Sequence, residues 1–310
     1  MTQSTDINTG TSAATKRGAA NWLARWWDPR ARSRPAPMTT QGALRALTAT
    51  AAGRIGITCA TAVVAVIAAG ALRHASTDTV SITDAFLPPS WAHPFGTDDF
   101  GRDELARVSV AGRTSLSAAV LVMAIATAAA LVLGTSAGLI GGVLDAAMMR
   151  VTDVLLAIPN LVLAMAVIGA LGPGFDHLVI ALSVGYVASF TRMTRAFALS
   201  ARHRADLAAA RLAGLGWWRS VLGHVARPVA GQLTIISTLS FGDVVISIAA
   251  LSFLGLGVRP PTPEWGAMLS DSRGNVAVAP WLLLAPGLAI VLTAIAVNLI
   301  ADALREGDPG

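Results

Sequence analysis

The stretch SLSAAVLVMAIATAAALVLGTSAGLIGG, residues 115–142, contains no charged side chain in 28 consecutive positions. The hydrocarbon core of a bilayer is about 30 Å thick and takes roughly 20 apolar residues per helical crossing, so this stretch is long enough to span a membrane. Its apolar residues are continuous rather than alternating in period two, which favours a helix over a strand of a membrane barrel. The stretch therefore predicts a transmembrane helix.

Five more apolar runs accompany it along the chain. Together they predict an all-α integral membrane protein with six transmembrane helices, at 55–72, 115–142, 154–171, 178–191, 229–257 and 280–301. The fourth run is the shortest because Arg192 and Arg195 follow it, and it crosses only if these side chains extend toward the headgroups. The composition agrees, since 54% hydrophobic and 13% charged residues lie far outside the balance of a soluble domain.

The basic residues indicate the topology. Of the 23 Lys and Arg residues, eight lie in 1–54 and seven in 192–227, whereas 73–113 holds four beside six acids and 258–279 holds two. Loops rich in Lys and Arg remain in the cytoplasm. We therefore expect an integral protein of the cytoplasmic membrane with both termini in the cytoplasm and an extracytoplasmic loop at 73–113. The arginines follow the topology rather than one soluble face, so no nucleic-acid partner is expected.

Residues 1–54 are predicted to form a cytoplasmic tail. Three tryptophans between positions 22 and 27 lie at helical spacing beside arginines, which fits either a short helix in the lipid headgroups or an unstructured tail. The first apolar run starts after more than fifty residues and lacks a small-residue cleavage site, so 55–72 is expected to remain as a transmembrane helix. Its Cys59 is the single cysteine, which excludes a disulfide framework.

Two acids in the apolar regions are candidates for a substrate path. Asp243 lies well inside the fifth run, where a charge costs about 2.5–3.5 kcal/mol on insertion scales. It either faces an aqueous cavity or a partner or, slightly favoured, reaches water near the inner end of its helix. Asp153, near the start of the third run, has the same two alternatives, with Arg150 one helical turn away as an ion partner.

The second run carries a glycine pattern. Gly134, Gly138 and Gly142 recur every four residues and predict one helix face on which a neighbour approaches closely. The same region matches G-x-S-x-G around Ser136, the nucleophile elbow of hydrolases, but that elbow needs a strand-to-helix turn with His and Asp partners. Helix packing is the better explanation.

Motifs for nucleotide or metal chemistry are absent from the sequence. The P-loop needs a lysine after a glycine pattern that Lys16 does not have, H-E-x-x-H does not occur, and the five histidines lack ligand spacing. We therefore expect a chain that is not an enzyme, binds no metal or cofactor itself, and provides a pathway or a coupling instead.

The segment HRADLAAARLAGLGWWRSVLGHVARP, residues 203–228, lies between two apolar runs. It predicts two short helices joined by glycines, the second with an apolar stripe at Trp218, Val221, Leu222 and Val225. It fits a surface that anionic lipid attracts or a knob that docks into another protein. The candidate docking residues are Asp206, Ala208, Ala209, Ala210, Arg211, Gly214, Gly216 and Trp218.

This segment, with AAARLAGLG followed by His224 and Pro228, resembles the cytoplasmic EAA loop of ABC importer permeases. Further stretches resemble the second, C-type permease subunit of dipeptide, oligopeptide and nickel transport systems, over roughly residues 85–306; they include HPFGTDDFGRDELARV (93–108), MRVTD (149–153), ALSFLGLGVRPPTPEWGAML (250–269) and APWLLLAPGLAI (279–290). Two positions depart from the family pattern, because Ala208 replaces the Glu of the triplet and Ile248 replaces a common acid.

The resemblance implies a MetI-like, type I permease fold with a core domain at 114–306 and a coupling loop at 203–228. It implies a permease subunit that forms, with a homologous permease, a path for di- or oligopeptides. The implied partners are two ATP-binding subunits or domains, which would bind ATP and Mg²⁺, an extracytoplasmic substrate-binding protein, and membrane lipid.

Residues of the outer loops are candidates for contact with these partners, although the charged ones individually are expected to pair within their own loop; the candidates are Trp91, Asp98, Arg102, Asp103 and Trp265. A nickel chelate or another small solute is the alternative substrate. A transporter driven by an ion gradient is the alternative from another class, which would need more intramembrane charge and an inverted repeat.

Overall fold

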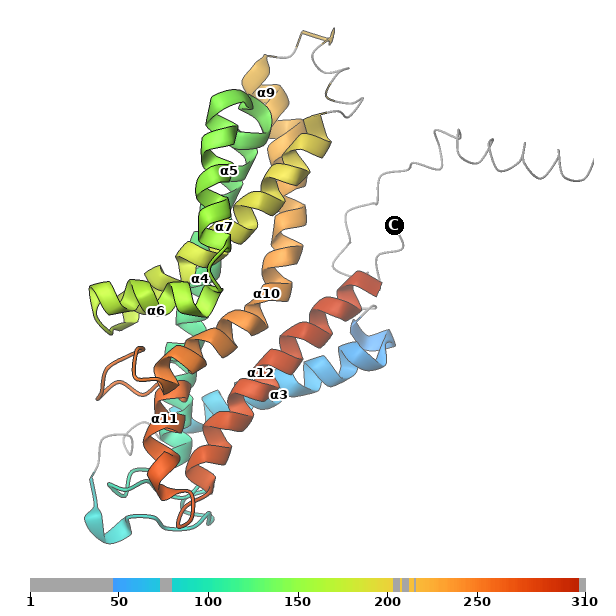
Figure 1. Cartoon of the computed structure of the whole chain (residues 1–310). Coiled ribbons are helices and arrows are strands. Elements are labelled where there is room, and N and C mark those ends of the chain that lie inside the picture. The colour runs from blue at the N-terminus through green and yellow to red at the C-terminus, as the bar shows by residue number, and fades with distance from the viewer. Residues whose placement is uncertain (1–46, 73–79, 203–206, 208–211, 215, 307–310) are drawn as a thin grey trace, which may run out of the picture.

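The computed structural model describes residues 47–72, 80–202, 207, 212–214 and 216–306, and these residues form a helical protein (Figure 1). Its α-helices are α3 (Ala51–Ala71), α4 (Glu104–Ile140), α5 (Gly142–Leu156), α6 (Asn160–Leu171), α7 (Phe175–Arg202), α9 (Trp217–Val221), α10 (Arg227–Phe253), α11 (Trp265–Ser272) and α12 (Trp281–Glu306). A π-helix, Leu222–Ala226, joins α9 to α10, and 3-10 turns lie at Ile82–Asp84 and Arg273–Asn275.

Helix α4 organises the fold. Its 37 residues extend about 55 Å at 1.5 Å per residue. Helix α7 packs along it, α10 packs against α4, α7 and α12, and α3 lies beside α12 (Figure 1). We call the end of the molecule that carries α9 and the junction of α4 with α5 the α9 end. The opposite end, with α11 and residues 80–103, is the α11 end.

Several helices are long and apolar enough to cross a membrane. Among the described residues these are α3, α4, α12 and the stretch Arg219–Phe253 that contains α10, and α5 with α6 makes a fifth if the bent pair is one crossing. The fold is therefore an all-helical, multi-pass membrane protein. By length and composition, the described helices give four or five crossings rather than the predicted six. Helix α7 covers the predicted fourth run, and its 28 residues include Arg192 and Arg195.

The predicted third crossing, 154–171, is not one helix. It is divided between α5 and α6, whose axes differ by 92°. Pro159 lies at the break with φ −52° and ψ 133°. Proline has no N–H to donate to the preceding turn, and it disfavours the helical conformation of Ile158 before it. Pro159 is visible in the sequence as a helix breaker, but the uncharged run 154–171 around it predicted one continuous helix.

The glycine face of α4 meets α7. A Cβ atom on Gly134 would lie 2.5 Å from the Cβ of Thr194, and one on Gly138 would lie 2.8 Å from the Cβ of Ala198. The close approach predicted for these two glycines is confirmed. Gly142 is a correction, because α4 ends at Ile140 and nothing lies within 4 Å of a Cβ placed on Gly142.

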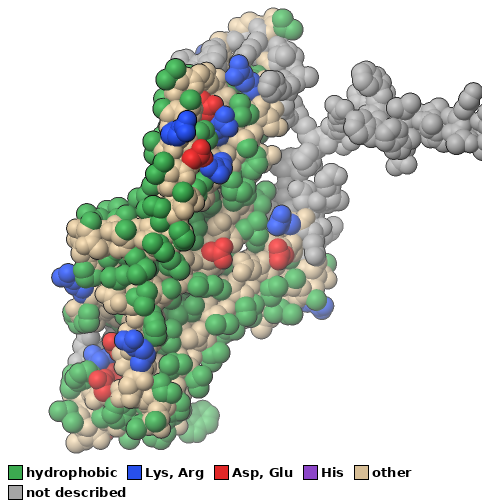
Figure 2. All heavy atoms as spheres, in the orientation of Figure 1, with side chains coloured by type: hydrophobic (Ala, Val, Ile, Leu, Met, Phe, Trp, Pro, Cys, Tyr) green, Lys and Arg blue, Asp and Glu red, His purple; other side chains and the backbone are tan. Residues whose placement is uncertain are grey.

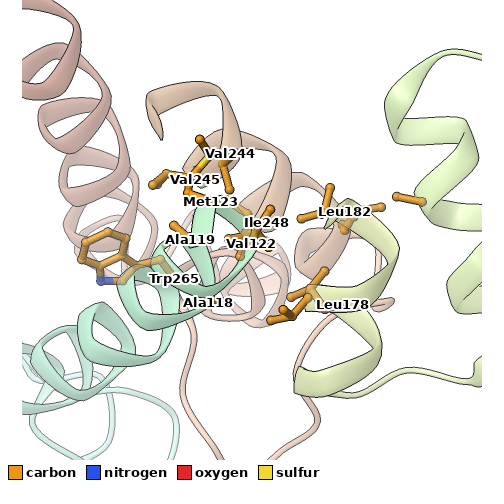
Figure 3. Packing of buried hydrophobic residues seen from close by; sticks show 14 of the residues in the cluster. Ala118, Ala119, Val122, Met123, Leu178, Leu182, Val244, Val245, Ile248 and Trp265 are labelled. Atoms are coloured by element: carbon orange, nitrogen blue, oxygen red, sulfur yellow. The ribbon is translucent and has the colours of Figure 1, made fainter. Parts of the chain in front are cut away.

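Small and aliphatic side chains form the core between α4, α7 and α10. Figure 3 shows Val122 of α4 next to Ile248 of α10, with Leu182 of α7 in the same cluster. Ala118, Ala119, Ala126 and Ala130 of α4 are at most 1% exposed, so the helices pack through close van der Waals contact. On the face in Figure 2, hydrophobic side chains cover the middle, and charged side chains gather toward the two ends with a few scattered between.

Candidate functional site

An exposed turn at the α9 end occupies the predicted coupling segment. Leu207 is 1% exposed and packs with Ala198, Ala201, Val225 and Val229, so it holds the segment to the bundle. After it, Leu212 is 90% exposed. A glycine turn follows this leucine.

Gly214 has φ +79°. An L side chain rarely adopts that backbone conformation, so glycine is needed to reverse the chain there. Gly216 is exposed as well. We call residues 212–214 and 216 the projecting turn; the buried Leu207 precedes it in the sequence.

The predicted residues of this segment are only partly described. Gly214 and Gly216 lie in the turn and Trp218 lies in α9, while Asp206, Ala208, Ala209, Ala210 and Arg211 lie outside the described residues. The predicted apolar stripe is partly wrong: Val221 and Val225 are buried, but Leu222 is 64% exposed. The π-helix at Leu222–Ala226 explains this, because its wider turn changes which side chains share a face.

Two ion pairs connect α5 to α7. Arg195 donates to both carboxylate oxygens of Asp145, from Nε at 2.5 Å and from Nη2 at 2.7 Å, and Arg192 donates to Asp153. The predicted ion partner of Asp153, Arg150, is therefore wrong; the partner comes from another helix rather than from the next turn. The two arginines that interrupt the apolar pattern of α7 are both matched by acids of the bent α5–α6 segment.

Asp243 lies near the middle of α10. It follows Arg227 by sixteen residues, about 24 Å along the helix, and its side chain is exposed in the single chain. Its backbone carbonyl accepts a hydrogen bond from Ser247 Oγ at 2.8 Å. None of the described side chains forms an ion pair with its carboxylate, so the charge faces the surroundings of this chain.

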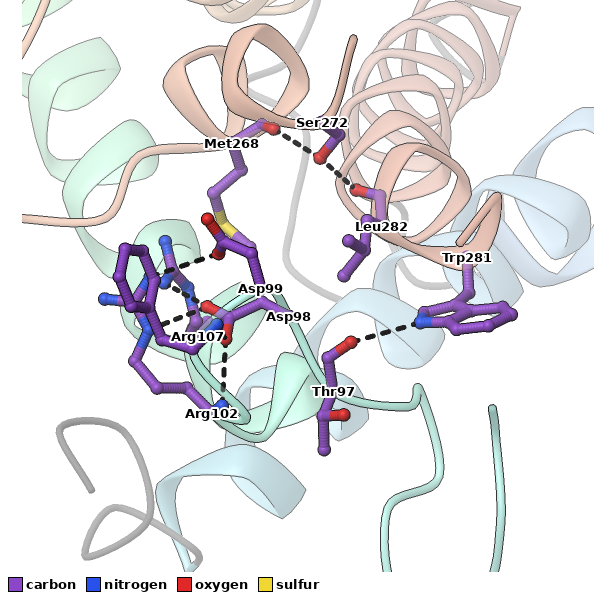
Figure 4. Close-up of polar contacts among 10 residues, drawn as sticks. Thr97, Asp98, Asp99, Arg102, Arg107, Met268, Ser272, Trp281 and Leu282 are labelled. Atoms are coloured by element: carbon purple, nitrogen blue, oxygen red, sulfur yellow. Dashed lines mark hydrogen bonds and ion pairs between the residues drawn. The ribbon is translucent and has the colours of Figure 1, made fainter. Parts of the chain in front are cut away.

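At the α11 end, Asp98 organises the loop before α4 (Figure 4). One of its oxygens accepts from Arg102 Nε at 2.7 Å and Arg107 Nη1 at 2.5 Å, and the other accepts from the backbone N–H groups of Phe100 and Arg102. Asp103 accepts from the Ala106 N–H as the N-cap of α4 and pairs with His93 at 2.9 Å. These charges hold their own loop together.

The two predicted tryptophans of this end differ completely. Trp91 is 100% exposed. Trp265 is 1% exposed and donates from Nε1 to the Val108 carbonyl at 3.0 Å, so it packs inside the chain and presents no surface to a partner. Sequence reasoning missed its neighbour Glu264, a buried N-cap that accepts from Ser115 Oγ at 2.7 Å.

A charged cavity of about 470 Å³ opens between this loop and α11. Its lining includes Asp98, Arg107, Glu104 and Asp271. Partial burial raises the pKa of Asp271 and repulsion from Asp99 adds to the effect, while Arg107, Arg102 and Arg273 oppose it. The sequence contained no motif for this cavity, because its walls come from segments more than 150 residues apart.

These features define a multi-pass helical membrane protein with polar sites at both ends of an apolar bundle. Residues 130–306 match the family model described as "Binding-protein-dependent transport system inner membrane component". That range is more than half of the chain, and the chain belongs to this family of transport components.

Curated relatives agree with this assignment. The nickel transport system permease protein NikC of Escherichia coli K12 is 38% identical over 73% of this chain and 82% of its own length. The probable D,D-dipeptide transport system permease protein DdpC of the same organism is 38% identical over 74% and 77%. The dipeptide transport system permease protein DppC of Alkalihalophilus pseudofirmus is 39% identical over 71% and 73%. All three are named as permease proteins.

Proposed function

We propose that the chain is one of two permease subunits of an ATP-driven importer of short peptides. Two of the three relatives above are named for dipeptides and one for nickel, so a nickel chelate or another small solute is the second candidate. The partners are a homologous permease, two ATP-binding subunits or domains that hold ATP and Mg²⁺, and an extracytoplasmic substrate-binding protein.

In this proposal six segments cross the cytoplasmic membrane. They are α3, α4, the bent pair α5 and α6, α7, α10 and α12 in the MetI-like arrangement of type I permeases. The ion pairs of Arg192 and Arg195 with acids of α5 support a crossing for α7, because pairing reduces the cost of charge in an apolar environment. Both termini and the α9 end lie in the cytoplasm, and the α11 end lies outside.

The observation that carries the proposal is the exposed turn at residues 212–214 and 216, with Leu207 buried against the bundle before it. A short turn with small residues and a rigid base fits a groove on another protein. Closure of the ATP-binding partners would move this turn, and the helices attached to it would shift the path between outward and inward access. Asp243 and Asp153 are proposed to face that path, and Trp91 is proposed to face an extracytoplasmic partner.

Uptake by the reconstituted importer tests the coupling role. Gly214→Trp should abolish ATP-dependent uptake of a labelled tripeptide into proteoliposomes while the chain still inserts and purifies. Gly255→Trp is the matched control, because Gly255 has φ +78°, has nothing within 4 Å of a placed Cβ, and lies toward the opposite end of α10. Retained uptake in the Gly214 variant, or equal loss in both, would contradict the coupling role.

Cysteine labelling tests the orientation. In a Cys59→Ala background, Trp91→Cys should react with a membrane-impermeant maleimide in intact cells, and Leu212→Cys should react only after the cells are opened. Both positions are highly exposed in the structure, so burial cannot explain a negative result. Reversed labelling would refute the proposed topology, and uptake without any ATP-binding partner would favour a transporter driven by an ion gradient.

A further inference from the structure

The cavity at the α11 end has walls from three parts of the chain. The loop before α4 contributes Asp98, Asp99 and Arg102, the segment 260–263 contributes one side, and α11 contributes Asp271 and Ser272. Three of the four residues in 260–263 are prolines, which have a carbonyl acceptor but no N–H donor. The wall is therefore rich in hydrogen-bond acceptors.

The charges that line the cavity are unequal. Asp98 is matched by Arg102 and Arg107 through direct hydrogen bonds. Asp99 is half-exposed and lies 3.9 Å from Arg102, and Asp271 makes no ion pair among the described residues. Counting Glu104 as well, four acids face two arginines, so the lining carries an excess of negative charge when its acids are ionised.

Glu104 is the unusual member of this lining. It is 2% exposed and faces the cavity, and no described residue forms a hydrogen bond or ion pair with its carboxylate. Arg107 lines the same cavity, yet its guanidinium already donates to Asp98. The Glu104 oxygens are not among the fully buried side-chain atoms that lack a partner, so they open onto the cavity, where a ligand can reach them. Glu104 therefore has an open position for a donor from outside the chain.

The chemistry of the lining indicates which class of hydrogen-bond donor the cavity accepts. The described residues contain no group of three or more His, Cys, Asp or Glu that could hold a metal ion. A primary ammonium carries three N–H donors and one positive charge, which suits one deep carboxylate, a second acid at the rim and carbonyl acceptors in the wall. A cavity of about 470 Å³ also lies within the range of small-ligand sites.

We propose that Glu104, with Asp271 at the rim, binds the free amino terminus of a short peptide entering from the extracytoplasmic side. The inference rests on the proposed function, which supplies the peptide class and the orientation of the α11 end. The site would be a weak docking position on the permease itself, separate from the binding protein that delivers the solute.

Saturation-transfer NMR tests this on the full chain in lipid nanodiscs, without ATP-binding subunits or a binding protein. Trialanine should receive saturation from the protein. N-acetyl-trialanine, which lacks the ammonium, should bind at least about tenfold more weakly, the loss expected for a hydrogen bond to a charged group. Equal signals from the two peptides, or none from trialanine, would overturn the proposal.

Variants of the chain test whether Glu104 is the residue that binds the peptide ammonium group. Glu104→Gln should weaken trialanine binding by about tenfold or more and leave the melting temperature unchanged, because the amide has nearly the same shape and no side-chain hydrogen bond among the described residues is lost. Asp271→Asn should weaken binding by a smaller factor, and Asp302→Asn, an exposed acid on α12, should have no effect. Undiminished binding to the Glu104 variant would overturn the assignment, and the comparison of peptides on the unmodified chain remains decisive if that variant fails to fold.

A third probe distinguishes the two possible sources of the ammonium group, a peptide amino terminus and a lysine side chain. n-Butylamine, which mimics a lysine side chain, should compete with trialanine. If n-butylamine binds and trialanine does not, the site accepts a side chain of a docked protein and the peptide proposal is overturned. If trialanine binds to the chain but the reconstituted importer takes up no peptide, the proposed import function is refuted and the binding site is not. The failure of each proposal is therefore distinguishable from the failure of the other.

Discussion

Replacing Asp98 by Asn should destabilise the α11 end strongly. Asp98 is 5% exposed and accepts four hydrogen bonds, two of them from guanidinium groups. The Asn oxygen can still accept from the two backbone N–H groups, but its NH2 group then faces the two arginines and can accept from neither. Arg107, whose side chain is 11% exposed, then loses the carboxylate with which it forms its ion pair. Removing one partner of a buried ion pair typically lowers the free energy of unfolding by about 3–5 kcal/mol.

The assay is equilibrium unfolding of the purified chain in mixed micelles, followed by tryptophan fluorescence. Asp99→Asn is the matched control, because Asp99 is 48% exposed and lies 3.9 Å from Arg102; its loss should change the free energy of unfolding by less than about 1 kcal/mol. Combining Asp98→Asn with Arg107→Met should cost less than the sum of the single changes, since the orphaned charge is gone. Equal effects of the Asp98 and Asp99 variants would refute the reasoning.

Three further predictions use the same unfolding assay. Gly134→Val should lower the free energy of unfolding by about 1–3 kcal/mol through overpacking, whereas Gly231→Val, with open space around its Cβ position, should change it much less. Ser115→Ala removes a donor from a buried carboxylate and should lower it by about 1.5–3 kcal/mol; the exposed Ser117→Ala should be nearly neutral. Because the pKa of Asp271 is raised in the fold, the folded state binds its proton more tightly than the unfolded state does, so this group's contribution to stability falls as pH rises above its ordinary value of 3.8. Asp271→Asn should remove that part of the pH dependence, and an unchanged profile would contradict it.

The apolar runs predicted the helices well because burial in lipid needs uninterrupted hydrophobic length, which a sequence displays directly. Run 55–72 became α3 and run 280–301 became most of α12. The close approach at Gly134 was predictable for a similar reason, since a four-residue repeat fixes one helix face. Such local patterns need no knowledge of distant neighbours.

The partners of the charged residues were not predictable in this way. Asp153 had a plausible local partner in Arg150, yet it pairs with Arg192, which lies 39 residues away. That choice depends on the packing of α5 along α7, which no local spacing shows. The cavity at the α11 end depends in the same way on contacts such as Ser115 with Glu264, 149 residues apart. Long-range pairing follows from the packed helices and leaves no spacing pattern in the sequence.

Helix α4 connects the two polar ends and, under the proposed coupling role, would pass motion between them. Its 37 residues contain no proline. Among the described elements, it contacts α11 near its start and the C-terminal half of α7 near its end. Sharp kinks arise at proline, π-bulges or inserted groups, so α4 is expected to move as a rigid unit. Helix α10 differs, because a π-helix joins it to α9, which follows the projecting turn. Under the proposed coupling role, a displacement of the turn would reach α10 through α9 and the π-helix, while Leu207, packed on α7, would carry it to α4 through the tight Gly134 and Gly138 contacts.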